Sequence, residues 1–120
     1  MPISERQSLT PGDIVVVPFP YSDRFAEKRR PALVVSSDRL NRTGFVWLAM
    51  ITSAKQARLP EDVLIRKLAP SGLSAPSLVR PVKIACAEPS RILRSIGRLD
   101  PKETSLVVAK LHAFIGSTSK

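Results

Sequence analysis

The chain has 120 residues, 43% of them hydrophobic, and a net charge of +9 from 19 Lys and Arg against 10 Asp and Glu. This length fits one domain with its own core, and no apolar run approaches the ~20 residues of a membrane span. The single cysteine and single histidine exclude a disulfide framework and a zinc site rich in either residue. No basic segment followed by an apolar stretch stands at residues 1–11, so we expect no signal peptide and a cytoplasmic, metal-independent protein with a polyanionic partner.

The first half of the chain alternates short apolar runs with turn residues. After a polar segment, 1–11, which we expect to be a flexible tail, β-branched runs bounded by turn residues predict buried strands. These strands cover 14–17, 31–36 and 45–52. Pro18 and Pro20 end the first, and the long polar loop 22–30 separates it from the second. The eight-residue run 45–52 fits a central strand that is buried on both faces.

The second half continues with two strands before any helix. Residues 63–66 predict a short strand, 69–76 a loop, and 78–86 a fifth strand in which Pro81 indicates an edge position or a bulge. Residues 88–96 are typical of a short helix that Gly97 would end. This order, strands first and helices last, favours a mainly β fold: a small antiparallel barrel with C-terminal helices.

The last helix has the most complete local signals. Asp100 can cap it, Pro101 suits its first position, and Glu103 stands where a capping box requires it. Apolar residues then recur at helical spacing and predict one buried stripe, formed by Val107, Val108, Leu111, Phe114 and Ile115. We therefore expect a single domain over 12–116, followed by a short tail, 117–120.

Several motifs, in order, resemble one known family. The opening motifs are Gly12–Val17, Phe19-Pro20 and Lys28–Ser36, and Ile51-Thr52-Ser53 is the next. Later landmarks are Gly72-Leu73, Ser77–Val79, Arg91-Ile92 and Ile96–Leu99. Each is weak alone, but their order and spacing from about residue 12 to residue 116 resemble the MazF/PemK toxins of type II toxin–antitoxin systems.

The resemblance implies both a fold and an activity. It implies the SH3-like barrel of the MazF/PemK/CcdB-like fold, a homodimer, and no cofactor. It also implies a sequence-specific endoribonuclease (an mRNA interferase) that cleaves single-stranded RNA, often mRNA. An acidic antitoxin would neutralise the dimer by laying its C-terminal segment across it.

RNA supplies its own nucleophile for such a reaction. Attack by the 2′-hydroxyl on the adjacent phosphate gives a 2′,3′-cyclic phosphate and a 5′-hydroxyl, and the transition state gathers negative charge that a fixed arginine can stabilise without a metal. The resemblance assigns this role to Arg30 and a catalytic hydroxyl to Thr52. Pro31 restricts the backbone of Arg30 to extended conformations. The general base stays open, and Thr52 could instead be an ordinary strand residue.

The remaining candidates would bind RNA. Cations and an aromatic ring in the first loop, with polar residues on later strands, suit phosphates and unpaired bases. They are Tyr21, Arg24, Lys28, Arg29, Ser53, Arg80 and Lys83. Because strand alternation puts Thr52 and Ser53 on opposite faces, only one of them should serve a given site. Val82 stands where relatives carry an acidic residue, and Lys83 replaces a common glutamine, which predicts a different RNA specificity.

Three residues fall outside this chemistry. We expect His112 on the helix surface, Cys86 in the core, and Trp47 in the core or a dimer interface. Two other functions stay open: a catalytically inactive module that binds nucleic acid or antitoxin, and a gyrase poison of the same fold. The C-terminal segment 116–120 lacks the terminal aromatic residue of such poisons. A membrane-surface role is the least favoured, because the last helix carries few basic residues.

Overall fold

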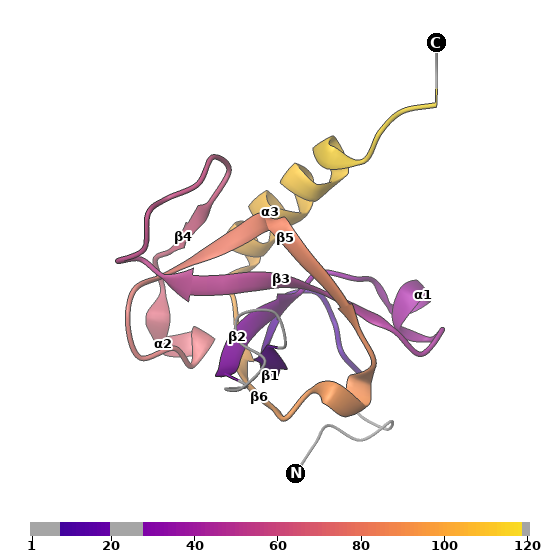
Figure 1. Ribbon diagram of the computed structural model, residues 1–120, viewed down its shortest axis with the longest axis horizontal. Coiled ribbons are helices and arrows are strands. Elements are labelled where there is room, and N and C mark those ends of the chain that lie inside the picture. Colours follow the sequence, from indigo (N-terminus) through magenta and orange to yellow (C-terminus); the bar gives the residue numbers. More distant parts are fainter. Residues whose placement is uncertain (1–7, 20–27, 119–120) are drawn as a thin grey trace.

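The computed structural model describes residues 8–19 and 28–118, which form one antiparallel sheet and a C-terminal helix (Figure 1). The strands are β1 Asp13–Phe19, β2 Lys28–Val34, β3 Val46–Ser53, β4 Val63–Ile65, β5 Ser77–Ala87 and β6 Arg94–Arg98. The helices are α1 Asp38–Asn41, α2 Leu68–Ser71 and α3 Pro101–Phe114, with a 3₁₀ turn at Pro89–Arg91. The order of the strands across the sheet is β4-β5-β3-β2-β1-β6.

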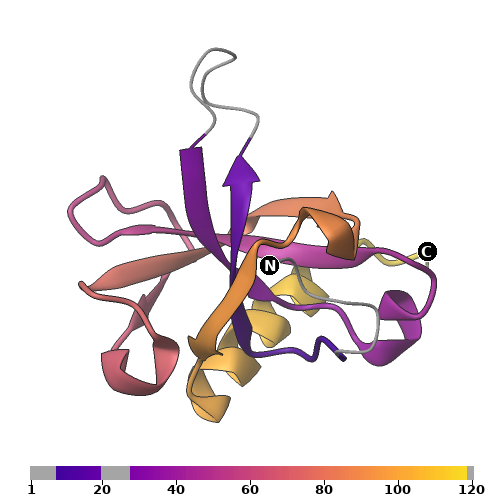
Figure 2. The ribbon, with the colours of Figure 1, turned by 90° about the horizontal axis from the view of Figure 1, so that it is seen from below.

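The sheet curls into a half-barrel (Figure 2). It buries apolar side chains on both of its faces. One core cluster contains Ile14, Leu33 and Ile51 and packs against Val107 of α3. The other contains Val15, Ala32 and Met50 and packs against Leu9 and Ile92. The alternation of the two sets along each strand follows the two-residue period of a β-strand. The mainly β, antiparallel fold with a terminal helix is confirmed, and so is the central position of the third predicted strand.

The packed domain begins at an earlier residue than the sequence predicts. Leu9, within the expected tail, is 6% exposed and belongs to the second core cluster. The side-chain nitrogen of Asn41 donates a hydrogen bond to the carbonyl oxygen of Leu9 over 2.7 Å, and Ser36 Oγ donates to Asn41 Oδ1 over 2.6 Å. Residues 8–11 are thus part of the domain, while residues 1–7 lie outside the described residues.

β5 changes direction sharply in mid-strand (Figure 1). Its pairing with β3 passes from Ala49↔Ile84 directly to Met50↔Arg80, so three residues have no partner residue on β3: Pro81, Val82 and Lys83. The bulge that Pro81 predicted is confirmed. The alternative, an edge strand, is wrong, because β5 lies between β4 and β3. Proline lacks the N–H that a regular ladder would need here.

The helix predicted over 88–96 is wrong. That segment forms the 3₁₀ turn and then β6, which pairs with β1. Gly97 does not end a helix but lies in β6 against the backbone of α2, where a Cβ atom would come within 2.5 Å of Pro70 O and Ser71 O. The first residues of the predicted loop 69–76 belong to α2, a single turn that ends at Ser71 and is followed by Gly72 with φ +75°.

α3 begins as predicted but is used differently. The Asp100 side chain accepts a hydrogen bond from the Lys102 N–H over 3.1 Å, as an N-cap does. The capping box is not formed: Glu103 Oε2 accepts from the Arg66 N–H over 2.9 Å instead. Of the predicted stripe only Val107 is buried, while Phe114 and Ile115 are exposed. None of the helices in the described ranges combines the length and hydropathy that a membrane span needs.

Candidate functional site

A cavity of about 610 Å³ opens beside β2, β3 and the bulge of β5. It collects predicted site residues from three strands that are far apart in the sequence. Its lining residues are Arg30, Met50, Ile51, Thr52, Gln56, Arg80, Val82, Lys83, Ile84 and Ala85. Four of the nine predicted site residues, Arg30, Thr52, Arg80 and Lys83, therefore line one cavity.

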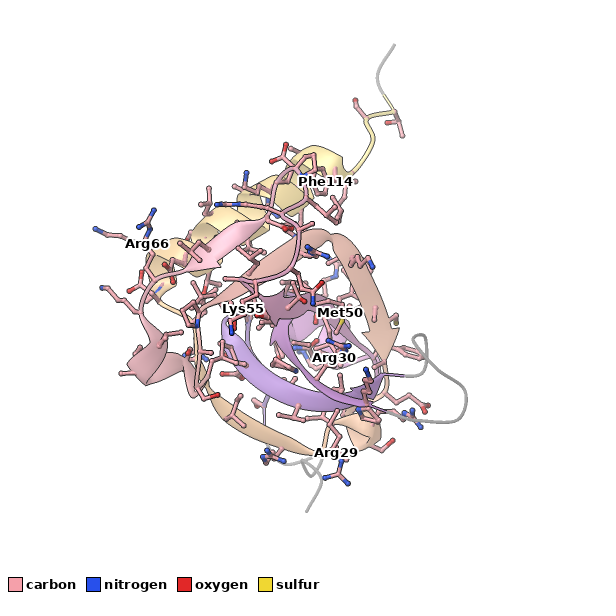
Figure 3. The ribbon with its side chains drawn as sticks, turned by 60° about the vertical axis from the view of Figure 1, so that its left-hand side comes forward. Arg29, Arg30, Met50, Lys55, Arg66 and Phe114 are labelled. Carbon is pink, nitrogen blue, oxygen red and sulfur yellow. The ribbon has the colours of Figure 1, made fainter. Side chains whose placement is uncertain are left out.

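The register of β2 and β3 explains why Arg30 and Thr52 come together. Ala32 pairs with Met50, the last pair of this ladder at that end. Two residues further along each strand stand Arg30 and Thr52, which by alternation share the sheet face of Ala32 and Met50. Figure 3 shows Arg30 beside Met50. Thr52 is half-buried and stays fixed in the sheet through its pairing with Leu78 of β5.

Other predicted residues lie elsewhere. Ser53 is exposed, does not line the cavity, and its Oγ accepts from the Lys55 N–H over 3.1 Å. Arg29 lies on the opposite face of β2 from Arg30, and its side chain points away from Arg30 (Figure 3). Lys28 is exposed at the start of β2 and does not line the cavity. Tyr21 and Arg24 lie outside the described residues.

The bulge of β5 brings two cations to the cavity. Arg80 is the last residue before the bulge, and its side chain is 13% exposed. Its Nε donates to Asp62 Oδ2 over 3.2 Å, and its Nη2 donates to the Ala57 carbonyl. Lys83, at the other end of the bulge, is exposed. Asp62 itself does not line the cavity.

The charge of the cavity suits an anion. Its described lining contains two guanidinium groups, from Arg30 and Arg80, and the ammonium group of Lys83, but no carboxylate and no imidazole. Thr52 and Gln56 add neutral hydrogen-bonding groups. Guanidinium groups bind phosphate with two parallel hydrogen bonds, and their planar fork holds that geometry. The cavity can therefore hold a phosphate group against three cations and a hydroxyl.

Sequence reasoning missed part of this site. The alternation of β3 that points Thr52 into the cavity also predicts Met50 there, but Gln56 and Asp62 lie in the loop after β3, and no periodicity marks them. One residue outside the site was placed wrongly, because Cys86 is exposed rather than buried. Of the two places expected for Trp47, the core is wrong, since its side chain is 43% exposed, and the dimer interface stays a prediction. His112 is exposed, as expected.

A second, larger cavity of about 830 Å³ lies beside α1, β3 and α3. Its walls include Trp47, Leu111 and Ile115, and the charged or titratable side chains among its described lining are Arg39 and His112. Since it does not combine clustered cations with a hydroxyl fixed in the sheet, it does not offer the phosphate chemistry of the first cavity.

The fold matches known toxin structures. The MazE–MazF complex of Deinococcus radiodurans (Form-II) is similar at TM-score 0.68 and 23% identity, over 93% of this chain and 99% of that one. An endoribonuclease of a mycobacterial species, in complex with its cognate antitoxin, is similar at TM-score 0.68 and 18% identity, over 92% and 100%. The Mycobacterium tuberculosis toxin MazF-mt6 is similar at TM-score 0.63 and 22% identity, over 82% and 90%.

At these identities the similarity to solved structures is one of fold, and no curated protein matches the sequence. The family itself comes from the sequence. Residues 10–115 match the family described as PemK-like, MazF-like toxin of type II toxin-antitoxin system, and this range includes the whole sheet and all of α3. The chain belongs to this PemK-like, MazF-like toxin family.

Proposed function

We propose that this protein is a toxin that acts in the cytoplasm as a metal-independent endoribonuclease, cutting single-stranded RNA at a short sequence motif. The observation that carries the proposal is the presence of Arg30 and Thr52 in one cavity with two further cations. Membership of the toxin family supports it. So does the net charge of +9, because RNA is a polyanion.

The cavity would act on the scissile phosphate. The 2′-oxygen attacks phosphorus and loses its proton, the O2′–P bond forms, and the P–O5′ bond breaks as O5′ takes up a proton. Negative charge grows on the non-bridging oxygens, and the guanidinium of Arg30 donates hydrogen bonds to them. The Thr52 hydroxyl donates to a phosphate oxygen or orients the 2′-hydroxyl. The products are a 2′,3′-cyclic phosphate and a 5′-hydroxyl.

The other predicted residues would bind the rest of the strand. Arg80 and Lys83, in the same cavity, would hold the scissile phosphate or the next one. Lys28 and Arg29 lie outside the cavity, so we place their contacts at more distant phosphates. Arg24 and Tyr21 stay predictions for a phosphate and an unpaired base, respectively. Lys83 donates only, so its contact with RNA would differ from that of an amide.

Two protein partners complete the proposal. The similar toxins of D. radiodurans and a mycobacterial species were solved with antitoxins, and a basic chain suits an acidic antitoxin. A homodimer is the second partner, and the partly apolar groove that includes Trp47, Leu111 and Ile115 offers a surface for it. Light scattering during size-exclusion chromatography would test the dimer: a mass near 26 kDa, twice the 13.1 kDa chain, is expected.

The test is a cleavage assay on several long unstructured RNAs with EDTA present. We expect cuts at a recurring short motif, with cyclic-phosphate and 5′-hydroxyl ends. The absence of cuts by the folded wild-type protein would overturn the nuclease and leave the alternative of a non-catalytic module that binds nucleic acid or antitoxin. Cuts only after divalent cations are restored would overturn metal independence.

A further inference from the structure

The side chain of Arg80 is held in place from one side only. Its two hydrogen bonds use Nε, to Asp62 Oδ2, and Nη2, to the carbonyl of Ala57. Among the described residues no acceptor takes the N–H groups of Nη1. Because Arg80 also lines the cavity, its guanidinium is fixed by the loop between β3 and β4 and keeps donors for a ligand.

Asp62 is the fixed point of this arrangement. Its side chain is 0% exposed, and Oδ2 accepts from the Leu59 N–H over 2.8 Å as well as from Arg80. The Asp62 N–H in turn donates to the Leu59 carbonyl over 3.2 Å, which closes a turn. Pro60 fixes one backbone angle of that turn. The Asp62 carboxylate is therefore held by the backbone of its turn, independently of its bond to Arg80.

The same turn holds an unfavourable backbone conformation. Glu61 has φ +74°, which non-glycine residues seldom adopt, and its carboxylate accepts from Lys110 Nζ of α3 over 2.7 Å. Such conformations persist where the surrounding structure fixes them, often beside functional sites. The turn that presents Asp62 is thereby tied to α3.

Asp62 cannot itself act on RNA. It does not line the cavity, and Oδ1 is buried without a hydrogen-bond partner among the described residues. A buried ion pair is also no efficient way to stabilise a fold, because apolar residues of similar volume often do as well. What the pair supplies is a fixed direction for the Arg80 guanidinium.

We propose that Asp62 is a positioning residue: it holds Arg80 so that Nη1 donates to a phosphate oxygen of the RNA bound beside Arg30. The inference rests on the proposed function and deepens it, since it assigns a fixed second arginine to the phosphate site. Val82 supplies no carboxylate to the cavity; the Asp62 carboxylate lies outside the cavity and orients a cation, Arg80, that lines it.

The test compares Asp62→Asn with a control, Asp13→Asn. Asparagine keeps an acceptor for the Leu59 N–H but loses the charge that holds Arg80. The control removes the charge of another carboxylate paired with an arginine, Arg98, outside the cavity. We expect Asp62→Asn to lower the single-turnover cleavage rate by ~10-fold to 100-fold, as small misplacements of catalytic groups do, while the control stays within about twofold of wild type.

Repeating the Asp62 substitution in a variant that lacks Arg80 distinguishes the positioning role of Asp62 from a purely structural one. In the Arg80→Gln background, Asp62→Asn should not lower the rate further, because its effect passes through Arg80. An equal loss in both backgrounds, or a wild-type rate in the folded Asp62→Asn variant, would overturn the proposal.

A measurement on the wild-type protein tests the proposal even if the variants fail to fold or the protein cuts no RNA. The Nε–H of Arg80, assigned through bonds by NMR, should exchange slowly with water. The Arg80 guanidinium resonances should shift when a 2′-O-methyl RNA pool, which cannot be cleaved, is added. Fast exchange, or no shift at saturation, would overturn the proposal whether or not the protein is a nuclease.

Discussion

Replacing Gly97 by alanine tests the packing of α2 against β6. The added Cβ atom would lie 2.5 Å from Pro70 O, Ser71 C and Ser71 O. These are backbone atoms, so no side-chain rotation can relieve the clash, and α2 must move by about 0.9 Å to reach an ordinary contact distance. Overpacking of this kind costs up to about 3 kcal/mol. For a chain of this length that lowers the unfolding temperature by about 10 °C.

Thermal unfolding followed by circular dichroism would measure the effect against two other glycines. Neither Gly44 nor Gly116 has an atom within 4 Å of an added Cβ, but Gly44 has φ +98°. Gly116→Ala should therefore change stability by less than about 0.5 kcal/mol, and Gly44→Ala should lose about 1 kcal/mol through its backbone conformation alone. If Gly97→Ala unfolds at the temperature of Gly116→Ala, the close contact between α2 and β6 is wrong.

Three further predictions concern charge and the site. The hydrogen bond from Lys67 lowers the pKa of Asp100 below its ordinary value. The stabilisation of the fold by ionised Asp100 should therefore be complete at neutral pH and lost as the pH falls through that lowered pKa. The unfolding temperatures of wild type and Asp100→Asn should differ most at pH 7, and a difference that is unchanged at pH 2 would contradict this. Thr52→Val should lower the single-turnover cleavage rate roughly 100-fold and Ser53→Ala should hardly change it, whereas equal losses would refute the assignment of the cavity face. Affinity for single-stranded RNA, measured by fluorescence anisotropy, should fall with salt at a logarithmic slope of about −2 or steeper if Arg30 and the two other cavity cations contact phosphates, and a slope near zero would contradict such contacts.

The strands could be predicted because their signals are local. The run 45–52 is apolar and long, so it predicts the central strand β3. Pro81 predicts either an edge position or a bulge, and the bulge is present in β5. β6 could not be found in the same way. Arg94–Arg98 has no apolar alternation and contains Gly97, whose place is explained only by the backbone of α2 lying against it.

Contacts with residues far apart in the sequence also explain why some predictions for the helices were wrong. Glu103 fits a capping box in sequence, yet its carboxylate accepts from the backbone of Arg66, 37 residues away. Phe114 and Ile115 continue the apolar stripe of α3, but among the described residues nothing covers them enough to bury them. Helical periodicity predicts which residues share a face, and the length of the sheet decides how many of them it can cover.

The site was predictable where it follows from strand geometry. The Thr52–Ser53 alternation predicts that one of the pair faces the site, and the register with β2 selects Thr52. Asp62 and Gln56 could not be predicted, because both come from the loop after β3, whose course depends on the turn at Glu61 and on the ion pair with Arg80.

The measurement that tests the account most directly compares wild type with Arg30→Ala, in EDTA, for two quantities. One is the single-turnover cleavage rate of RNA, and the other is the affinity for a 2′-O-methyl RNA that cannot be cut. If Arg30 stabilises the transition state, the rate should fall at least ~100-fold while the affinity changes by less than about tenfold. An equal fall in both would make Arg30 a general RNA-binding residue, and an unchanged rate would place the chemistry outside this cavity.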